Sequence, residues 1–246
     1  MAARQAGLGP VRIRPLRTLR EFQSTLPLQS AIWGFDDSDQ VAPRLFGVFQ
    51  RIGGSCLGAY LGSEMVGFSL AFAAFKPDGL RYWHSHMAGV SPRLHGQGVG
   101  YRIKLRQREE ALAAGLDLIE WTFDPLQARN AHFNIEKLGA DIEAYLPDCY
   151  GITSSALHGA LPTDRLVAAW HLRSNRAVTR LEDRPRGGTD SAAHIEIPAC
   201  ISDVPRKQAA RVQARVRAAF QAAFASGLRV ARFQRTAAGG TYHLVA

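Results

Sequence analysis

The segment RLHGQGVG, from Arg93 to Gly100, decides the interpretation of the chain. Glycines occupy positions 96, 98 and 100, directly before YRIKLRQREEALAAG, which reads as a helix ending at Gly115 in the C′ position. The preceding run LRYWHSHMAGV is typical of a strand that ends at Val90. The segment is therefore predicted to be a glycine-rich turn between a strand and a helix.

Such a turn is suited to bind a phosphate-containing anion. Glycine lets the backbone approach a ligand closely, and the first N–H groups of a helix have no partner within it. The helix dipole also favours negative charge there, and Arg93 adds a cation at the rim. The alternative is an ordinary turn that needs glycine only for its geometry. The spacing fits neither the P-loop nor the dinucleotide fingerprint G-x-G-x-x-G.

The spacing does match R-x-x-G-x-G, with Arg93, Gly96 and Gly98. In this order of elements, the motif resembles the pyrophosphate-binding turn of the GNAT family of acyl-coenzyme A N-acyltransferases. The resemblance continues at Asn130 and at Lys137-Leu138-Gly139. It implies an α+β fold with a mixed, mostly antiparallel central sheet flanked by helices. It also implies transfer of an acetyl or succinyl group from coenzyme A to an amine.

The resemblance assigns coenzyme contacts to the end of the strand, to the turn and to two residues downstream. These are Met87, Ala88, Val90, Arg93, Leu94, His95, Gly96, Gln97, Gly98, Val99, Gly100, Asn130 and Lys137. The co-substrate would be acetyl-CoA or succinyl-CoA, with the Val90 N–H or a near neighbour binding the oxyanion. No metal is expected, because the chain's three cysteines are far apart and form no C-x-x-C.

Three residues, His84, Glu120 and Asp124, are candidates for the general base that deprotonates the amine. His84 and His86 lie two apart on a strand and should share a face, and histidine titrates near neutrality. His84 also falls near the position where some members of the resembling family keep a catalytic glutamate. Glu120 and Asp124, on the next strand, are its rivals. The alternative for both histidines is hydrogen bonding in the sheet or lining the substrate cleft.

The general acid is less clearly marked. The resembling family has a tyrosine four residues before the helix-ending glycine, and this chain has Ile135 there. Tyr145, Tyr150 or water could take its place, or the thiolate could leave unprotonated.

The acceptor is expected to be a small-molecule amine. The segment WTFDPLQARNAHFN (residues 121–134) is polar and suits a polar acyl chain or an amino-acid acceptor. Together with the glycine turn it resembles a GNAT subgroup that includes N-succinyltransferases acting on amino acids. An arginine could pair with a carboxylate of either substrate. Acetyl transfer to a small amine is the default within the same class.

The remaining third of the chain is not explained by the resemblance. A polar stretch from Asn175 to Ala193 contains DRPRGGTDS, the best candidate for a linker. We therefore predict an acyltransferase domain at 10–175 and a smaller αβ extension at 190–246. The extension has a helical stripe that includes Val212, Val216 and Phe220. Packing on its own strands, covering the acceptor cleft and forming a homodimer contact all stay open.

The composition and charge of the chain narrow the classes of partner that we expect. The net charge of +9 is nearly all arginine, spread along the chain without a dense basic run, so no nucleic-acid partner is expected. No run of 18 or more apolar residues and no secretory signal are visible, which favours a cytoplasmic protein without a membrane partner. The alternative function is a non-catalytic CoA-binding or nucleic-acid-associated module, which the missing tyrosine favours.

Overall fold

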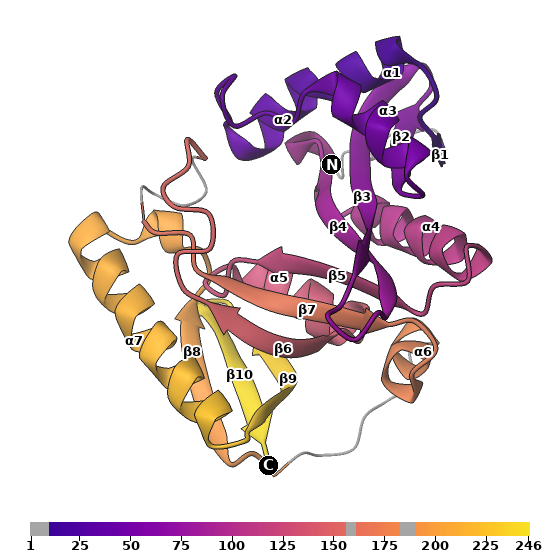
Figure 1. Cartoon of the computed structure of the whole chain (residues 1–246). Helices are drawn as coiled ribbons and strands as arrows, with labels where there is room; N and C mark the ends of the chain where they lie inside the picture. Colours follow the sequence, from indigo (N-terminus) through magenta and orange to yellow (C-terminus); the bar gives the residue numbers. More distant parts are fainter. Residues whose placement is uncertain (1–9, 156–160, 183–189) are drawn as a thin grey trace, which may run out of the picture. The chain divides into compact units, whose positions relative to one another are not determined.

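The computed structural model describes residues 10–155, 161–182 and 190–246. Its backbone forms two compact units, and each is described here by itself. The first unit comprises residues 10–33 and 40–115, and the second comprises residues 34–39 and the described residues from 116 to 246. Both combine helices with antiparallel strands, which confirms the predicted α+β class with mostly antiparallel sheet. Figure 1 shows the elements in chain order.

The first unit contains an antiparallel sheet with the strand order β1-β2-β3-β4. The strands are β1 (Val11–Pro15), β2 (Ser55–Leu61), β3 (Glu64–Phe75) and β4 (Arg81–Val90). Gly62, with a φ of 60°, makes the tight turn of the predicted β2–β3 hairpin. The strands lie where alternating or continuous apolar runs predict them.

Helices of the first unit pack on this sheet. They are α1 (Leu19–Gln23), α2 (Leu26–Trp33), α3 (Pro43–Arg51) and α4 (Val99–Ala113). Thr18 and Glu21 form the predicted capping box of α1. The single helix expected from Leu19 onward is divided, because Pro27 has no N–H and its ring clashes with the preceding turn.

Two apolar clusters hold the first unit together. Phe46 of α3 lies within 6.0 Å of both Phe22 and Phe68, measured between ring centroids. The other cluster joins Ile103 of α4 to Val11, Ala59 and Val66 on the strands, with Leu94 and Val99 from the glycine turn. Burying one such large apolar side chain contributes about 1.5–3 kcal/mol. The turn is thus anchored to the core from both of its ends.

The second unit contains two groups of strands. In the first, β7 (Arg165–His171) lies between β5 (Leu118–Phe123) and β6 (Asp141–Leu146) and is antiparallel to both. In the second, β10 (Gly239–Val245) lies between β8 (Ala193–Pro198) and β9 (Arg229–Arg235).

Helices of the second unit are α5 (Ala128–His132), α6 (Asn175–Leu181) and α7 (Arg206–Ala225). A π-helical turn, Phe133–Lys137, continues α5. The helix α6 begins in the polar stretch that contains the predicted linker, because Ser174 caps it by accepting the Ala177 N–H. Most of DRPRGGTDS, the predicted linker, lies outside the described residues.

The C-terminal elements pack onto the earlier part of the second unit. The ring of Phe220 on α7 stacks on Tyr145 of β6 and meets Tyr242 of β10 edge-on, with centroids 5.5 and 5.0 Å apart. Figure 1 shows α7 lying beside β8, on which it packs. Residues 190–246 therefore belong to one compact unit with the elements from β5 to α6.

Candidate active site

The glycine turn leads from β4 into α4 through a short 3-10 helix, Pro92–Leu94. Gly96 and Gly98 have φ angles of 79° and 77°, in the left-handed region that other residues rarely adopt. Gly98 is the N-cap of α4, and Arg102 N–H donates the first bond of the helix to its carbonyl at 3.1 Å. The N–H groups of the first turn have no acceptor within the helix. The predicted strand, turn and helix are confirmed.

Space around the turn is open. A Cβ placed on Gly96 or Gly98 would meet no heavy atom within 4 Å. A Cβ on Gly100, in the first turn of α4, would meet only Val90 Cγ2, at an ordinary distance of 3.7 Å. The glycines are therefore not needed to let the protein pack against itself. Their arrangement leaves room for an anion beside the helix N-terminus.

The side chains of the turn fold back onto the protein. Leu94 and Val99 are each 3% exposed and belong to the core, so they can contact a ligand only through their main chain. His95 Nε2 lies 3.0 Å from the carbonyl oxygen of Val90. The turn is thereby held in one shape before any ligand arrives.

Arg93, the predicted rim cation, is paired with Glu64 of β3 at 2.5 Å, and the two side chains are 52% and 60% exposed. Gln97 donates its side-chain N–H to the Arg93 carbonyl at 3.3 Å. An exposed ion pair contributes about 0–1 kcal/mol, so exchanging Glu64 for an anionic ligand would cost little.

β4 carries a bulge among the predicted site residues. Ser85 pairs with Ala71 of β3 and Met87 pairs with Leu70, so His86 is an extra residue in the ladder. The bulge shifts the alternation of β4 by one position between the histidines and the glycine turn. A strict period of two, read from the sequence, does not show this shift.

Two main-chain N–H groups near the end of β4, those of Ala88 and Val90, point away from β3. Ser91 N–H donates to the Val66 carbonyl at 2.8 Å, next to the Gly67–Val90 pair. Bonded and non-bonded pairs alternate in an antiparallel ladder, so Gly67 and Val90 form a non-hydrogen-bonded pair. The N–H of Val90, like that of Ala88 two residues earlier, therefore points in the plane of the sheet away from β3. The predicted oxyanion contact needs this orientation.

His84 and His86 share one face, as predicted. Their ring centroids lie 6.2 Å apart, and both rings contact Phe72, at 5.2 and 5.8 Å. Burial, with smaller contributions from His86 and Lys104, lowers the pKa of His84 to about 4. Burial also lowers the pKa of His86. Both imidazoles are therefore neutral at pH 7 and can accept a proton, although His84 is a weak base.

Lys104 of α4 lies beneath β4 and was missed by the sequence reasoning. Its side chain is buried, and Nζ donates to Ser85 Oγ at 2.9 Å and to Gln107 Oε1 at 3.1 Å. Burial lowers the pKa of Lys104 to about 7. The available signal was its position beside Ile103 in the buried stripe of α4, where a charged residue is unusual.

The rival bases lie in the second unit. Glu120 is buried on β5, and Asp124 follows the end of that strand. Asp124 Oδ1 accepts the Leu126 N–H at 2.8 Å, which supports the turn at Pro125. Burial raises the pKa of Asp124 to about 6, despite this hydrogen bond. Asp124 is therefore a stronger base than His84.

The two candidate tyrosines have different surroundings. Tyr145 is buried, and its hydroxyl donates to Asp164 Oδ2 at 2.5 Å. Burial and this bond raise the pKa of Tyr145 well above its usual value. Arg217 also binds both oxygens of Asp164, at 2.9 and 2.6 Å. Tyr145 is thus part of a closed hydrogen-bond network.

Tyr150 is 49% exposed, and its hydroxyl lies 2.8 Å from Thr122 Oγ1 on β5. Partial burial raises the pKa of Tyr150, which keeps the phenol protonated. Ile135, at the position of the expected tyrosine, is completely buried in the core. Of the two tyrosines, Tyr150 is the exposed one.

The predicted site residues are distributed over both units. The residues from His84 to Gly100 lie together on β4, the turn and α4 of the first unit. Glu120, Asp124, Asn130 and Lys137 lie in the second unit, the last two exposed on α5 and the π-helical turn.

Two further observations concern metal binding and membrane-spanning helices. Within residues 10–155, 161–182 and 190–246, no three histidine, cysteine or acidic side chains gather in a group that could hold a metal ion. None of the described helices is both long and apolar enough to cross a membrane.

Comparison with known proteins identifies the fold. No protein-family model and no curated protein matches the chain. Its structure is similar to the ribosomal-protein-S18-alanine N-acetyltransferase of Escherichia coli, with a TM-score of 0.53 and 14% identity over 67% of this chain and 96% of that chain. It is also similar to a GNAT-family acetyltransferase from Desulfovibrio desulfuricans, with a TM-score of 0.54 and 15% identity over 66% and 99%. The chain therefore has the GNAT fold.

Proposed function

We propose that this chain is an acyl-coenzyme A-dependent N-acyltransferase that moves an acetyl or succinyl group to the amine of a small molecule, with amino acids among the acceptors. The observation that carries the proposal is the open glycine turn at the N-terminus of α4, in a chain with the GNAT fold. We propose residues 10–175 as the transferase domain.

The residues of the turn suit the pyrophosphate of coenzyme A. The first-turn N–H groups of α4 would donate to the phosphate oxygens, and Arg93 would exchange Glu64 for the ligand. The main chain from Met87 to Val90 would contact the pantetheine arm and the thioester, with Asn130 and Lys137 as further contacts. The outward N–H of Val90 supports its assignment to the oxyanion.

The proton transfers are assigned to the remaining candidates. The base takes a proton from the acceptor ammonium, so that the neutral amine can attack the thioester carbon, and the departing thiolate then receives a proton. His84, Glu120 and Asp124 are the proposed bases. Tyr150 is the proposed acid, because the residue is exposed and its phenol is protonated, whereas Tyr145 is buried and bound to Asp164.

Thermal unfolding with acetyl-CoA, succinyl-CoA and free CoA tests the coenzyme site. A ligand that binds only the native state raises the midpoint when its concentration exceeds its dissociation constant. Gly100→Glu should abolish this shift, because its carboxylate would lie where the pyrophosphate binds. The same carboxylate favours the helix N-terminus, so the ligand-free midpoint should not fall. Gly100→Gln, equal in size but neutral, is the matched control and should retain part of the shift.

The donor that gives the largest shift is then assayed for thiol release with small amines and amino acids. The absence of a shift with all three compounds would contradict the coenzyme site. Binding without thiol release for any acceptor would favour the alternative, a non-catalytic CoA-binding module. Ile135 in place of the expected tyrosine and the net charge of +9 favour this alternative. If the chain is instead a nucleic-acid-associated module, its affinity for nucleic acid should fall steeply as the salt concentration rises.

A further inference from the structure

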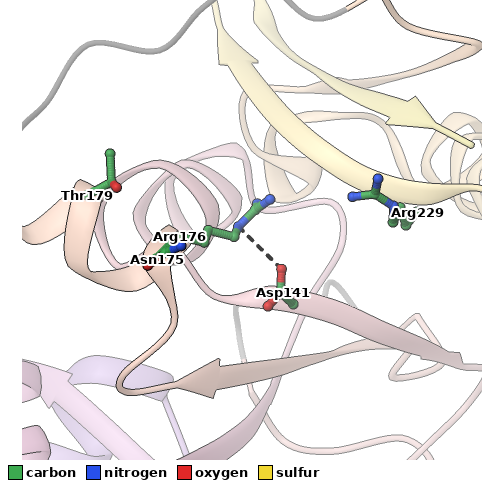
Figure 2. Close-up of a pocket in the computed structure, with 5 residues that line it drawn as sticks. All are labelled: Asp141, Asn175, Arg176, Thr179 and Arg229. Atoms are coloured by element: carbon green, nitrogen blue, oxygen red, sulfur yellow. Dashed lines mark ion pairs between the residues drawn. The ribbon is translucent and has the colours of Figure 1, made fainter.

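A pocket of about 440 Å³ lies in the second unit, apart from every residue assigned above. Its lining residues come from β6, α6 and β9: Asp141, Asn175, Arg176, Thr179 and Arg229. Figure 2 shows the guanidinium groups of Arg176 and Arg229 extending toward each other, with the Asp141 carboxylate below Arg176.

The two arginines of the pocket are incompletely paired. Arg176 Nε lies 3.4 Å from Asp141 Oδ1, a long contact for an ion pair. Nε and Nη2 of Arg176 are both buried and have no hydrogen-bond partner among the described residues. Arg229 is solvent-exposed and has no ion pair with any described residue. A buried guanidinium N–H without an acceptor is costly, so an anion in this pocket that accepts from Arg176 would remove that cost.

The surrounding framework fixes the pocket. Glu136 of the π-helical turn accepts the Phe233 N–H of β9 at 2.8 Å and pairs with Arg180 of α6 at 2.5 Å. Gly139 lies so close to α6 that a Cβ there would be 2.8 Å from the Arg176 carbonyl oxygen. These contacts hold α6 and β9 at the pocket, so the two guanidinium groups cannot separate by a shift of their elements.

We propose that this pocket binds a small carboxylate-containing molecule. Two arginines and one aspartate give the lining a net charge of +1, which a single carboxylate neutralises. A phosphate dianion would leave an excess negative charge beside Asp141. The second oxygen of Asp141, with the polar side chains of Asn175 and Thr179, is available to an ammonium or hydroxyl group of the same ligand. The chemical class is thus a small amino acid or hydroxy acid.

Side-chain Nε–Hε resonances of arginine, recorded by ¹H–¹⁵N NMR on the full chain, test the proposal. Acetate, glycine and inorganic phosphate are titrated separately at constant pH and ionic strength. Acetate and glycine should shift the Arg176 and Arg229 resonances to saturation, with glycine binding more tightly. Arg229→Gln should weaken this binding by about tenfold or more. Arg235→Gln replaces an exposed arginine at the end of the same strand; it is the control and should leave the binding unchanged.

A second variant tests the proposed role of Asp141. Asp141→Asn should remove the preference for glycine over acetate while both still bind. Saturation by phosphate alone, no saturation by any probe, or equal loss in Arg235→Gln would each overturn the proposal. The proposal does not depend on the coenzyme site, so the two can fail separately.

Discussion

Lys104 shows how one residue can link the stability of the first unit to pH. Its ammonium group lies in the α4–sheet interface and donates hydrogen bonds to two uncharged side chains, those of Ser85 and Gln107. Burial disfavours the charged form, and its pKa falls from 10.5 to about 7. Between these two values the unfolded chain holds a proton on Lys104 that the folded chain lacks. The free energy of unfolding therefore rises with pH across this window.

Replacing Lys104 by methionine should stabilise the protein most at pH 7 and below, because it removes the cost of the buried charge. The gain should shrink as the pH rises toward 10, by up to about 1.4 kcal/mol per pH unit. Urea unfolding at several pH values measures it. Lys207→Met, at an exposed position of α7, should show no such dependence. Parallel pH curves for Lys104→Met and the wild type would contradict the prediction.

The pH dependence of the proposed reaction distinguishes two of the three proposed bases. If His84 is the base, kcat/KM should lose activity only as the pH falls toward 4, because the pKa of His84 is about 4. If Asp124 is the base, the acidic limb should lie near pH 6. His84→Ala should remove the limb near pH 4 and lower the rate about 10²–10⁴-fold. His86→Ala is the control, and an unchanged rate in His84→Ala would exclude His84.

At the scale of the elements, the sequence predicts most boundaries because local chemistry sets them. The capping box at Thr18 and the glycines at 98, 115 and 227 act within a few residues of the boundary. The bulge at His86 and the π-helical turn after His132 were not predicted, because both depend on contacts between distant segments. The burial of Lys104 was missed for the same reason.

Gly139 and Gly227 allow the cost of backbone strain to be distinguished from the cost of close packing. Gly139 and Gly227 both follow a helix, with φ angles of 73° and 77°. A Cβ at Gly227 would meet nothing within 4 Å, whereas one at Gly139 would collide with Arg176. Gly227→Ala should therefore cost about 1 kcal/mol for the left-handed backbone alone. Gly139→Ala should cost at least about 1 kcal/mol more, from the packing term. Equal losses in urea unfolding would show that α6 moves away freely.

At the scale of the whole molecule, the described C-terminal segment is joined to the second unit by a buried polar cluster as well as by packing. Asp164, 1% exposed, precedes β7 and binds Tyr145 of β6 and Arg217 of α7. The predicted domain boundaries follow the order of the chain. The compact units do not, because residues 34–39 group with the second unit, where the Ser154 N–H donates to Asp39 Oδ2 at 2.6 Å.

Arg217→Met should destabilise the second unit by about 2 kcal/mol or more, because it leaves the Asp164 carboxylate buried without a countercharge. Partial exposure of Arg217 places the loss below that of a fully buried pair. Urea unfolding measures it, with Arg211→Met, on the exposed side of the same helix, as the control. Similar losses in both variants would show that the pair contributes little.

The bulge of β4 also determines which length changes this gene could tolerate. Losing the codon for His86 would remove the extra residue and leave Ser85 opposite Ala71 and Met87 opposite Leu70 in regular pairing. The residues from Met87 to Val90 would keep their partners on β3, so Gly89 would stay where a Cβ would lie 2.7 Å from the ring of Trp33. A single-codon deletion at Gly62 would be more damaging, because it would shorten the two-residue turn that sets the register of β2 and β3. Natural length variation in these strands should therefore gather at the bulge and avoid that turn.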